Sequence, residues 1–356
     1  MKIIYIIGLL IIIVLATVSN YNKLNQSKIT NSKLSKQTIM ENKNLFLKEK
    51  IGVLDIQNHE NITVAQINYD TSKLDSIISL HEAFENKMIV VKELEEGERV
   101  NTIELENLSE SYIFILDGDI LKGAKQNRVV NTSVLVAPKT KIILPVSCVE
   151  EGRWKYKSSR FQPSDEIAHR SIRYSKANYI SESKKLNRCD FTVDQSAVWN
   201  EVESVSDSLE FHSKTMSHSD LFDNYKEELD DITKKFTMQS KANGLLIFVG
   251  NQMVACDIFN NNKIYCDYFE KIIKTSALDS NLQKDKKAQI SIDQSSIIES
   301  MHRVFDQFNN SKDVASSTPG VSEGTETRLN LVDNTFYGLS HKGQSVHQSI
   351  LFSNSK

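Results

Sequence analysis

Short apolar runs in the first half of the chain predict β-strands. Within each run the residues are β-branched or alternate with polar residues, and the runs recur about every ten to fifteen residues, a spacing that indicates strands joined by turns. The runs span residues 51–56, 62–68, 88–94, 99–105, 111–116, 129–136 and 141–148. This pattern is typical of a β-sandwich or a barrel.

After residue 154 the apolar residues repeat with the period of helices. Three apolar stripes predict helices over residues 198–209, 221–236 and 297–308. Ser296 and Glu299 have the spacing of a capping box and would begin the third helix.

The second half also contains strand signals. They are apolar runs at residues 244–250 and 253–259, which flank a tight turn, and at 328–332, 335–341 and 345–352. Residues 263–278 fit a helix better than a strand, and residues 311–327 read as a polar loop. We therefore predict an α+β fold in which a β-rich half, 48–155, packs with a mixed α/β half, 156–353. Both halves belong to one domain, and its closing hairpin can return to the first sheet.

The amino-terminal segment predicts a membrane signal. Residues 3–18 are uncharged and mostly apolar, slightly fewer than the roughly 20 residues that span a bilayer. We predict a signal anchor over residues 1–20, with a cleaved signal peptide as the alternative, followed by a polar tether over 21–47. Lysines in the tether favour a cytoplasmic body, whereas Lys2 and the usual export role of such segments oppose it. We expect a membrane-anchored or exported protein with an extracytoplasmic body.

Composition excludes several classes of protein. The 356 residues include 43 basic and 46 acidic side chains, a formal charge of −3, so we expect no nucleic-acid partner, which usually requires a basic excess. Four cysteines are too few for a disulfide scaffold, and their spacing matches no zinc site. No metal is therefore predicted. Cys256 and Cys266 would face each other in a hairpin, but they need not meet if residues 263–278 are helical.

The densest polar cluster, residues 116–128, lies between two predicted strands. It contains Asp117, Asp119, Lys122, Lys125, Gln126, Asn127 and Arg128. Lysine and arginine donors, together with exposed backbone N–H groups, could hold a phosphate while the amides or carboxylates bind a ribose or a base. The alternative is a surface hairpin whose charges neutralise one another. No Walker or dinucleotide-binding motif is present.

Residues 145–154 place a second polar group at the end of a strand. Glu150 and Arg153 predict an ion pair, and Trp154 offers a face on which an aromatic ring can stack. An ordinary strand end, with the tryptophan covering the core, is the alternative. Cys148 has no histidine near it in the sequence, so we predict a buried structural thiol rather than a nucleophile.

Two histidines flank the last predicted turn. His341 and His347 would lie on or near one sheet, where His347 is a candidate general base. The alternative is that each is a satisfied polar group on a strand.

These polar blocks carry a resemblance to a known family. Residues 116–154 and 338–352 resemble the ADP-ribosylglycohydrolase- and rhodanese-phosphatase-associated protein domain, over about residues 50–353. The matching positions are Gly123, Ala124, Lys125, Gln126, Asn127, Arg128, Cys148, Glu150, Gly152, Arg153, Trp154 and His347. The resemblance implies a role around ADP-ribose and phosphate esters, and it implies no established reaction. The amino-terminal apolar segment departs from the pattern and puts a cytosolic nucleotide role in doubt.

Three functions are consistent with these residues. The first is binding of a phosphate-bearing small molecule, such as an ADP-ribose-related nucleotide, by Lys125, Gln126, Asn127, Arg128, Arg153 and Trp154. The second is hydrolysis of such a nucleotide, with Glu150 or His347 as general base and one of the two aspartates holding a divalent cation. The third is a membrane-tethered interaction module without small-molecule chemistry. The sequence identifies no cofactor.

Overall fold

The computed structural model describes most of the chain after the predicted tether. The described residues are 38–40, 45–46, 50–74, 76–94, 100–153, 155, 157–188, 190–282 and 292–353. The chain divides into a unit of residues Met1–Thr38 and a compact unit of residues Ile39–Lys356. The predicted membrane segment, residues 3–18, lies outside the described residues. Among those that are described, no helix has the length and apolar character needed to cross a bilayer.

Two sheets of the first half pack around one apolar core. The six-stranded sheet has the order β12-β8-β9-β11-β6-β5, and the three-stranded sheet has the order β10-β7-β4. Their strands are β4 (Ile77–Ser79), β5 (Ile89–Lys92), β6 (Thr102–Asn107), β7 (Tyr112–Ile115), β8 (Asp119–Gly123), β9 (Arg128–Val130), β10 (Val134–Val136), β11 (Lys141–Cys148) and β12 (Phe161–Ile167). Leu105, Ile113 and Val146 come from both sheets and join the same buried cluster. The predicted β-rich first half and the α+β class are confirmed.

A nine-stranded sheet unites the start and the end of this unit. Its order is β1-β15-β16-β17-β18-β14-β13-β3-β2. The strands are β1 (Thr38–Met40), β2 (Ile51–His59), β3 (Ile62–Tyr69), β13 (Gly244–Val249), β14 (Gln252–Phe259), β15 (Ala315–Pro319), β16 (Thr325–Asn330), β17 (Asn334–His341) and β18 (Gln344–Phe352). The predicted pair β13–β14 and the closing hairpin are confirmed. The hairpin turns at Lys342 and Gly343, whose φ values of 52° and 76° match the turn that two-residue hairpins favour.

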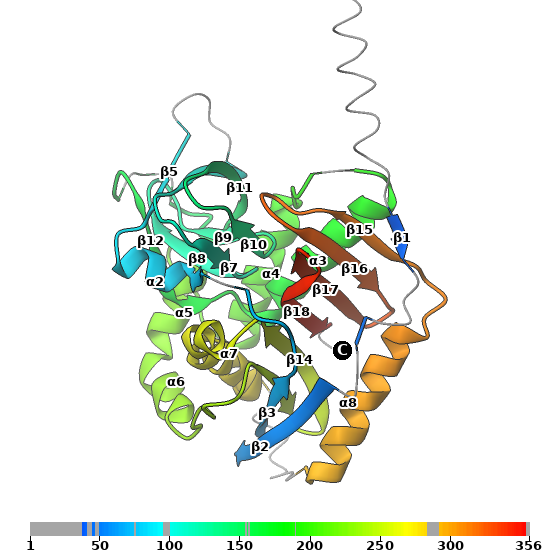
Figure 1. Ribbon diagram of the computed structural model, residues 1–356. Helices are drawn as coiled ribbons and strands as arrows, with labels where there is room; N and C mark the ends of the chain where they lie inside the picture. Colours follow the sequence, from blue (N-terminus) through cyan, green and yellow to red (C-terminus); the bar gives the residue numbers. More distant parts are fainter. Residues whose placement is uncertain are drawn as a thin grey trace, which may run out of the picture. The chain divides into compact units, whose positions relative to one another are not determined.

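Helices cover both faces of the nine-stranded sheet (Figure 1). Strand alternation sends Val64 and Ile247 to one face and Ala65 and Phe248 to the other. The first face packs against α5 (His218–Asn224), α6 (Lys226–Thr233) and α7 (Asn262–Leu282), and the second against α8 (Gln294–Asn309). Phe46 stacks on Phe305 of α8 at 4.3 Å between ring centroids.

Three details differ from the sequence expectations. The N-cap of α8 is Asp293, whose side chain accepts from the Ser296 backbone N–H, so the predicted capping box is wrong. The stripe at 221–236 forms two helices, α5 and α6, which meet at Tyr225. Residues 311–327 contain β15 and the start of β16, because pairing between these strands overrides their polar composition.

The remaining helices connect the sheets. They are α2 (Leu80–Glu85), α3 (Arg170–Lys185) and α4 (Gln195–Ser208). The cysteine alternative resolves as expected for a helix: Cys256 is buried on β14, Cys266 is exposed on α7, and both are free. Helix α3 buries several charged side chains and so gives the domain a polar interior.

Candidate functional site

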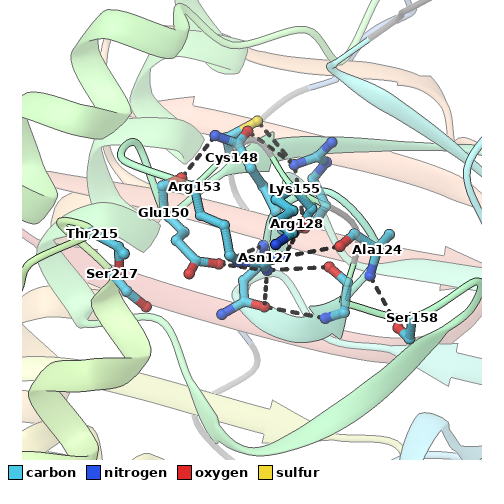
Figure 2. Close-up of polar contacts among 12 residues, drawn as sticks. Ala124, Asn127, Arg128, Cys148, Glu150, Arg153, Lys155, Ser158, Thr215 and Ser217 are labelled. Carbon is cyan, nitrogen blue, oxygen red and sulfur yellow. Dashed lines mark hydrogen bonds and ion pairs between the residues drawn. The ribbon is translucent and has the colours of Figure 1, made fainter.

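Two of the three predicted polar blocks meet in space. The turn between β8 and β9, residues 124–127, lies against residues 149–153, which follow β11 (Figure 2). Residues Thr215 and Ser217 border the second block. The Gly152 N–H donates to Thr215 O at 2.8 Å, and Glu150 forms an isolated antiparallel β-bridge with Ser217. Trp154 lies outside the described residues, and Lys125 is half-buried in the turn.

The amides of the first block hold neighbouring backbone. Gln126 is buried, and its Nε2 donates to Glu150 O at 2.8 Å and to Glu151 O at 3.3 Å. Asn127 Oδ1 accepts from the Gly123 N–H at 3.1 Å and from Arg153 Nη2 at 3.3 Å. Both amides therefore join the turn to the segment after β11.

Arg128 points into the interior rather than toward solvent. Its side chain is 1% exposed, and Nη1 donates to Gln126 O at 3.3 Å and to Cys148 Sγ at 3.1 Å. Nη2 lies 3.3 Å from Glu93 Oε1, while Nε has no hydrogen-bond partner. Cys148 is buried, as expected, and burial raises its pKa despite the nearby guanidinium. These features favour a structural thiol.

The predicted ion pair between Glu150 and Arg153 is confirmed. Arg153 Nη2 lies 2.6 Å from Glu150 Oε2, and the same carboxylate oxygen accepts from the Asn127 N–H at 3.2 Å. Arg153 Nη1 also donates to Ala124 O and Lys155 O, both at 2.9 Å. Ala124 has a φ of 44°, a left-handed conformation that costs energy for alanine, so the guanidinium fastens a strained turn.

His347 of the third predicted block belongs to a different, central network, which is built around Arg173. Arg173 of α3 is bidentate to two carboxylates: Nη2 lies 3.1 Å from Asp117 Oδ1 and 2.8 Å from Asp257 Oδ1. Its Nε and Nη1 complete the two pairs at 3.2 Å and 3.0 Å. Burial alone would raise the pKa of Asp257, yet Arg173 and a hydrogen bond from His347 outweigh it and hold that pKa well below its usual range.

His347 connects this ion-pair cluster to a serine. Its Nε2 lies 3.0 Å from Asp257 Oδ1, and its Nδ1 lies 3.2 Å from Ser133 Oγ. Serine, histidine and aspartate are the residue types of a hydrolytic triad, but the two imidazole nitrogens are exchanged relative to that arrangement and all three residues are fully buried. The rings of Phe114, Phe259 and Tyr337 surround the imidazole. His341, the other predicted histidine, lies 3.7 Å from Glu323 at the hairpin.

Two further charged groups lie near the same network. Asp119 accepts from Tyr268 Oη at 2.7 Å, and burial raises its pKa. Lys176 is buried, donates to Val130 O, and burial lowers its pKa to about 7. Both aspartates of the predicted cluster are thus engaged with protein groups. Among the described residues, no group of three or more histidine, cysteine or acidic side chains is placed to hold a metal.

A small hollow opens beside β8 and β12, where α5, α6 and α7 meet them. It has a volume of about 110 Å³ and is lined by Lys122, Asp165, Glu166, Phe222, Asp223, Lys226, Leu229, Asp230 and Lys274. Lys122 pairs with Glu166 at 2.5 Å, and Lys274 pairs with Asp230 at 2.7 Å. Lys122 belongs to the predicted polar cluster. It is the member of that cluster that lines the hollow.

Sequence reasoning missed the residues that complete these sites. The local signal for Arg173 is the spacing of Arg170, Arg173 and Lys176 along one helix face. Nothing near Lys226 or Lys274 in the sequence indicates a ligand site. Helices α6 and α7, which carry them, come close to Lys122 only in the folded chain.

Comparison with known proteins identifies a family but no individual relative. The family model of the ARG and Rhodanese-Phosphatase-superfamily-associated Protein domain matches residues 50–351. These residues contain the turn between β8 and β9, the central network around Arg173 and the hollow. Comparison with curated proteins and with solved structures gave no match. The chain belongs to the family of ARG and Rhodanese-Phosphatase-superfamily-associated Protein domains.

Proposed function

We propose that this domain binds a phosphate-bearing small molecule, such as an ADP-ribose-related nucleotide, in the hollow beside β8 and β12. The observation that carries the proposal is the convergence of Lys122, Lys226 and Lys274, from β8, α6 and α7, on one solvent-exposed hollow. Ammonium groups bind phosphate as point charges. The family description, which refers to association with phosphatase-superfamily proteins, is consistent with such a ligand.

The volume limits what can enter. About 110 Å³ is well below the roughly 300–1,000 Å³ of sites that enclose drug-sized ligands. A small phosphate compound, or the phosphate-bearing end of a nucleotide, would fill it. The predicted ligand residues Gln126, Arg128 and Arg153 act in this proposal as a brace for the turn that follows Lys122, because their described hydrogen bonds go to protein atoms.

Substitution of Lys226 tests the site. Its side chain is exposed and forms no ion pair with a described residue, so Lys226→Gln should leave folding unchanged. Calorimetry with ADP-ribose and with inorganic phosphate on the full chain should show roughly tenfold weaker binding in this variant. Lys235→Gln, just past the end of the same helix and outside the hollow, is the matched control. Equal affinities in both variants, or no binding by any phosphate compound, would contradict the proposal.

A hydrolase acting on such a nucleotide is the second candidate. The observation that favours it is the chain Asp257···His347···Ser133. Because these residues are buried, a substrate would reach them only after the interior opens. Loss of turnover in Ser133→Ala with binding retained would select this candidate. Turnover unchanged by that substitution would exclude this triad.

We also propose that residues 3–18 anchor the protein in a membrane with an extracytoplasmic body. The support is the uncharged, mostly apolar sequence of that segment. A carboxy-terminal reporter that is active on only one side of the membrane gives the orientation, and its distribution between soluble and membrane fractions tests the anchor.

A further inference from the structure

The charges that line the hollow are not all paired with one another. Two lysines and two carboxylates form the ion pairs Lys122–Glu166 and Lys274–Asp230. Three more charged residues line the same space: Lys226, Asp165 and Asp223. All three are exposed, and none lies at ion-pair distance from another described residue, although Lys226 adds to the effect of Lys274 in lowering the pKa of Asp230. The groups left for a ligand are one cation and two hydrogen-bond acceptors.

We infer that the hollow takes a sugar phosphate, in which the phosphate meets Lys226 and hydroxyl groups donate to Asp165 and Asp223. This inference rests on the proposed function and names its ligand class. An ionised carboxylate only accepts hydrogen bonds, so a ligand that displaces water from these two aspartates must supply donors. Inorganic phosphate brings at most two O–H groups at neutral pH, and its own negative charge is repelled by two carboxylates at close range.

A ligand with an ammonium group is the competing chemistry, since it would also satisfy the carboxylates. Lys226 opposes it, because this lysine has no carboxylate at ion-pair distance and repels a ligand cation, whereas Lys122 and Lys274 are already paired with Glu166 and Asp230. A neutral hydroxyl avoids this repulsion. In nucleotide-binding folds, acidic residues likewise bind ribose by accepting hydrogen bonds from its hydroxyl groups.

The apolar part of the lining fits the carbon skeleton of a sugar. Phe222 and Leu229 line the hollow and are largely buried, with 6% and 1% exposed. They are the apolar part of the lining and offer a ligand a small contact area. The C–H groups of a sugar can contact them, as ligand sites combine apolar walls with a few placed polar groups.

The test compares three probes on the full chain by calorimetry: ribose 5-phosphate, inorganic phosphate and phosphoethanolamine. Ribose 5-phosphate should bind the unmodified protein most tightly. Asp223→Ala should weaken its binding roughly fivefold, the effect of losing an ordinary hydrogen bond. The same substitution should leave binding of inorganic phosphate unchanged or strengthen it, because a repelling charge is gone.

Asp231→Ala is the matched control, since it removes an exposed acid from α6 that does not line the hollow. It should change neither affinity by more than twofold. If Asp223→Ala strengthens binding of both phosphates equally, the carboxylate only repels and the sugar inference fails, while the proposed function stands. Tighter binding of phosphoethanolamine than of ribose 5-phosphate would also overturn it. If no probe binds, the proposed function itself fails.

Discussion

Replacing Arg173 with methionine should destabilise the domain more than any change at a surface ion pair. The guanidinium donates four hydrogen bonds of 2.8–3.2 Å to Asp117 and Asp257, and its side chain is 1% exposed. Methionine fills similar space but leaves two buried carboxylates without their cation. Removing one partner of a buried ion pair costs about 3–5 kcal/mol.

The control is the same substitution at Arg303. That arginine lies 3.2 Å from Glu299 on α8, with 63% of its side chain exposed. An exposed pair one helical turn apart contributes about 0.3–0.5 kcal/mol, so Arg303→Met should be nearly neutral. Unfolding in guanidinium chloride, followed by circular dichroism, gives the free energy of unfolding of each variant. A loss below about 1 kcal/mol for Arg173→Met at pH 7 would refute the reasoning, which rests on uncompensated buried charge.

The pH dependence gives a second check on the same substitution. Because the folded-state pKa of Asp257 is depressed, its contribution to stability is present above the unfolded pKa of about 3.9 and is lost as the pH falls below it. Arg173→Met removes the largest favourable cause of that depression. The difference between the two proteins should therefore narrow as the pH falls below about 4. A difference that widens on acidification would contradict the assignment.

Three further outcomes are expected. Glu150→Gln should lower the free energy of unfolding by about 1–3 kcal/mol, because it removes the partner of Arg153; an unchanged thermal midpoint would instead assign Glu150 to ligand chemistry. The stability of the unmodified protein should rise between about pH 7 and pH 10, since folding lowers the pKa of Lys176 to about 7 and the unfolded chain then binds more protons; Lys176→Met should flatten this slope in denaturant titrations. Gly118→Ala should cost about 1–3 kcal/mol, because φ is 95° and the new Cβ would lie 2.9 Å from the Arg173 side chain, whereas Gly52→Ala, with no atom nearer than 3.9 Å, should not.

The strands could be predicted because their signal is local. Residues of β13 and β14 are apolar on both sides of a two-residue turn, and this pattern alone defines a hairpin. The polar strand β15 could not be predicted in this way. Its pairing with β16 depends on the assembled sheet, because backbone hydrogen bonds between strands form whether the side chains are polar or apolar.

The sites could be predicted only in part for a related reason. Adjacent charges such as Glu150 and Arg153 meet because they are three residues apart. By contrast, Asp117, Arg173 and Asp257 come from three distant segments, and nothing in any one segment specifies the other two. The same holds for Lys122 and Lys274 in the hollow. Long-range electrostatic partners depend on tertiary packing.

A dense polar block in a sequence can indicate either a ligand site or an internal brace, and the geometry of its donors separates the two. A backbone carbonyl in a tight turn needs a partner when the turn is buried, and Arg153 supplies one to Ala124, which is buried. A donor used in this way is not free to bind a phosphate without releasing a carbonyl into a buried environment, which costs about 1–3 kcal/mol. Lys226 carries no such penalty, because its ammonium group lies at the solvent-exposed hollow without an ion-pair partner among the described residues. For this reason a ligand should bind first at the hollow and not at the more conspicuous block beside it.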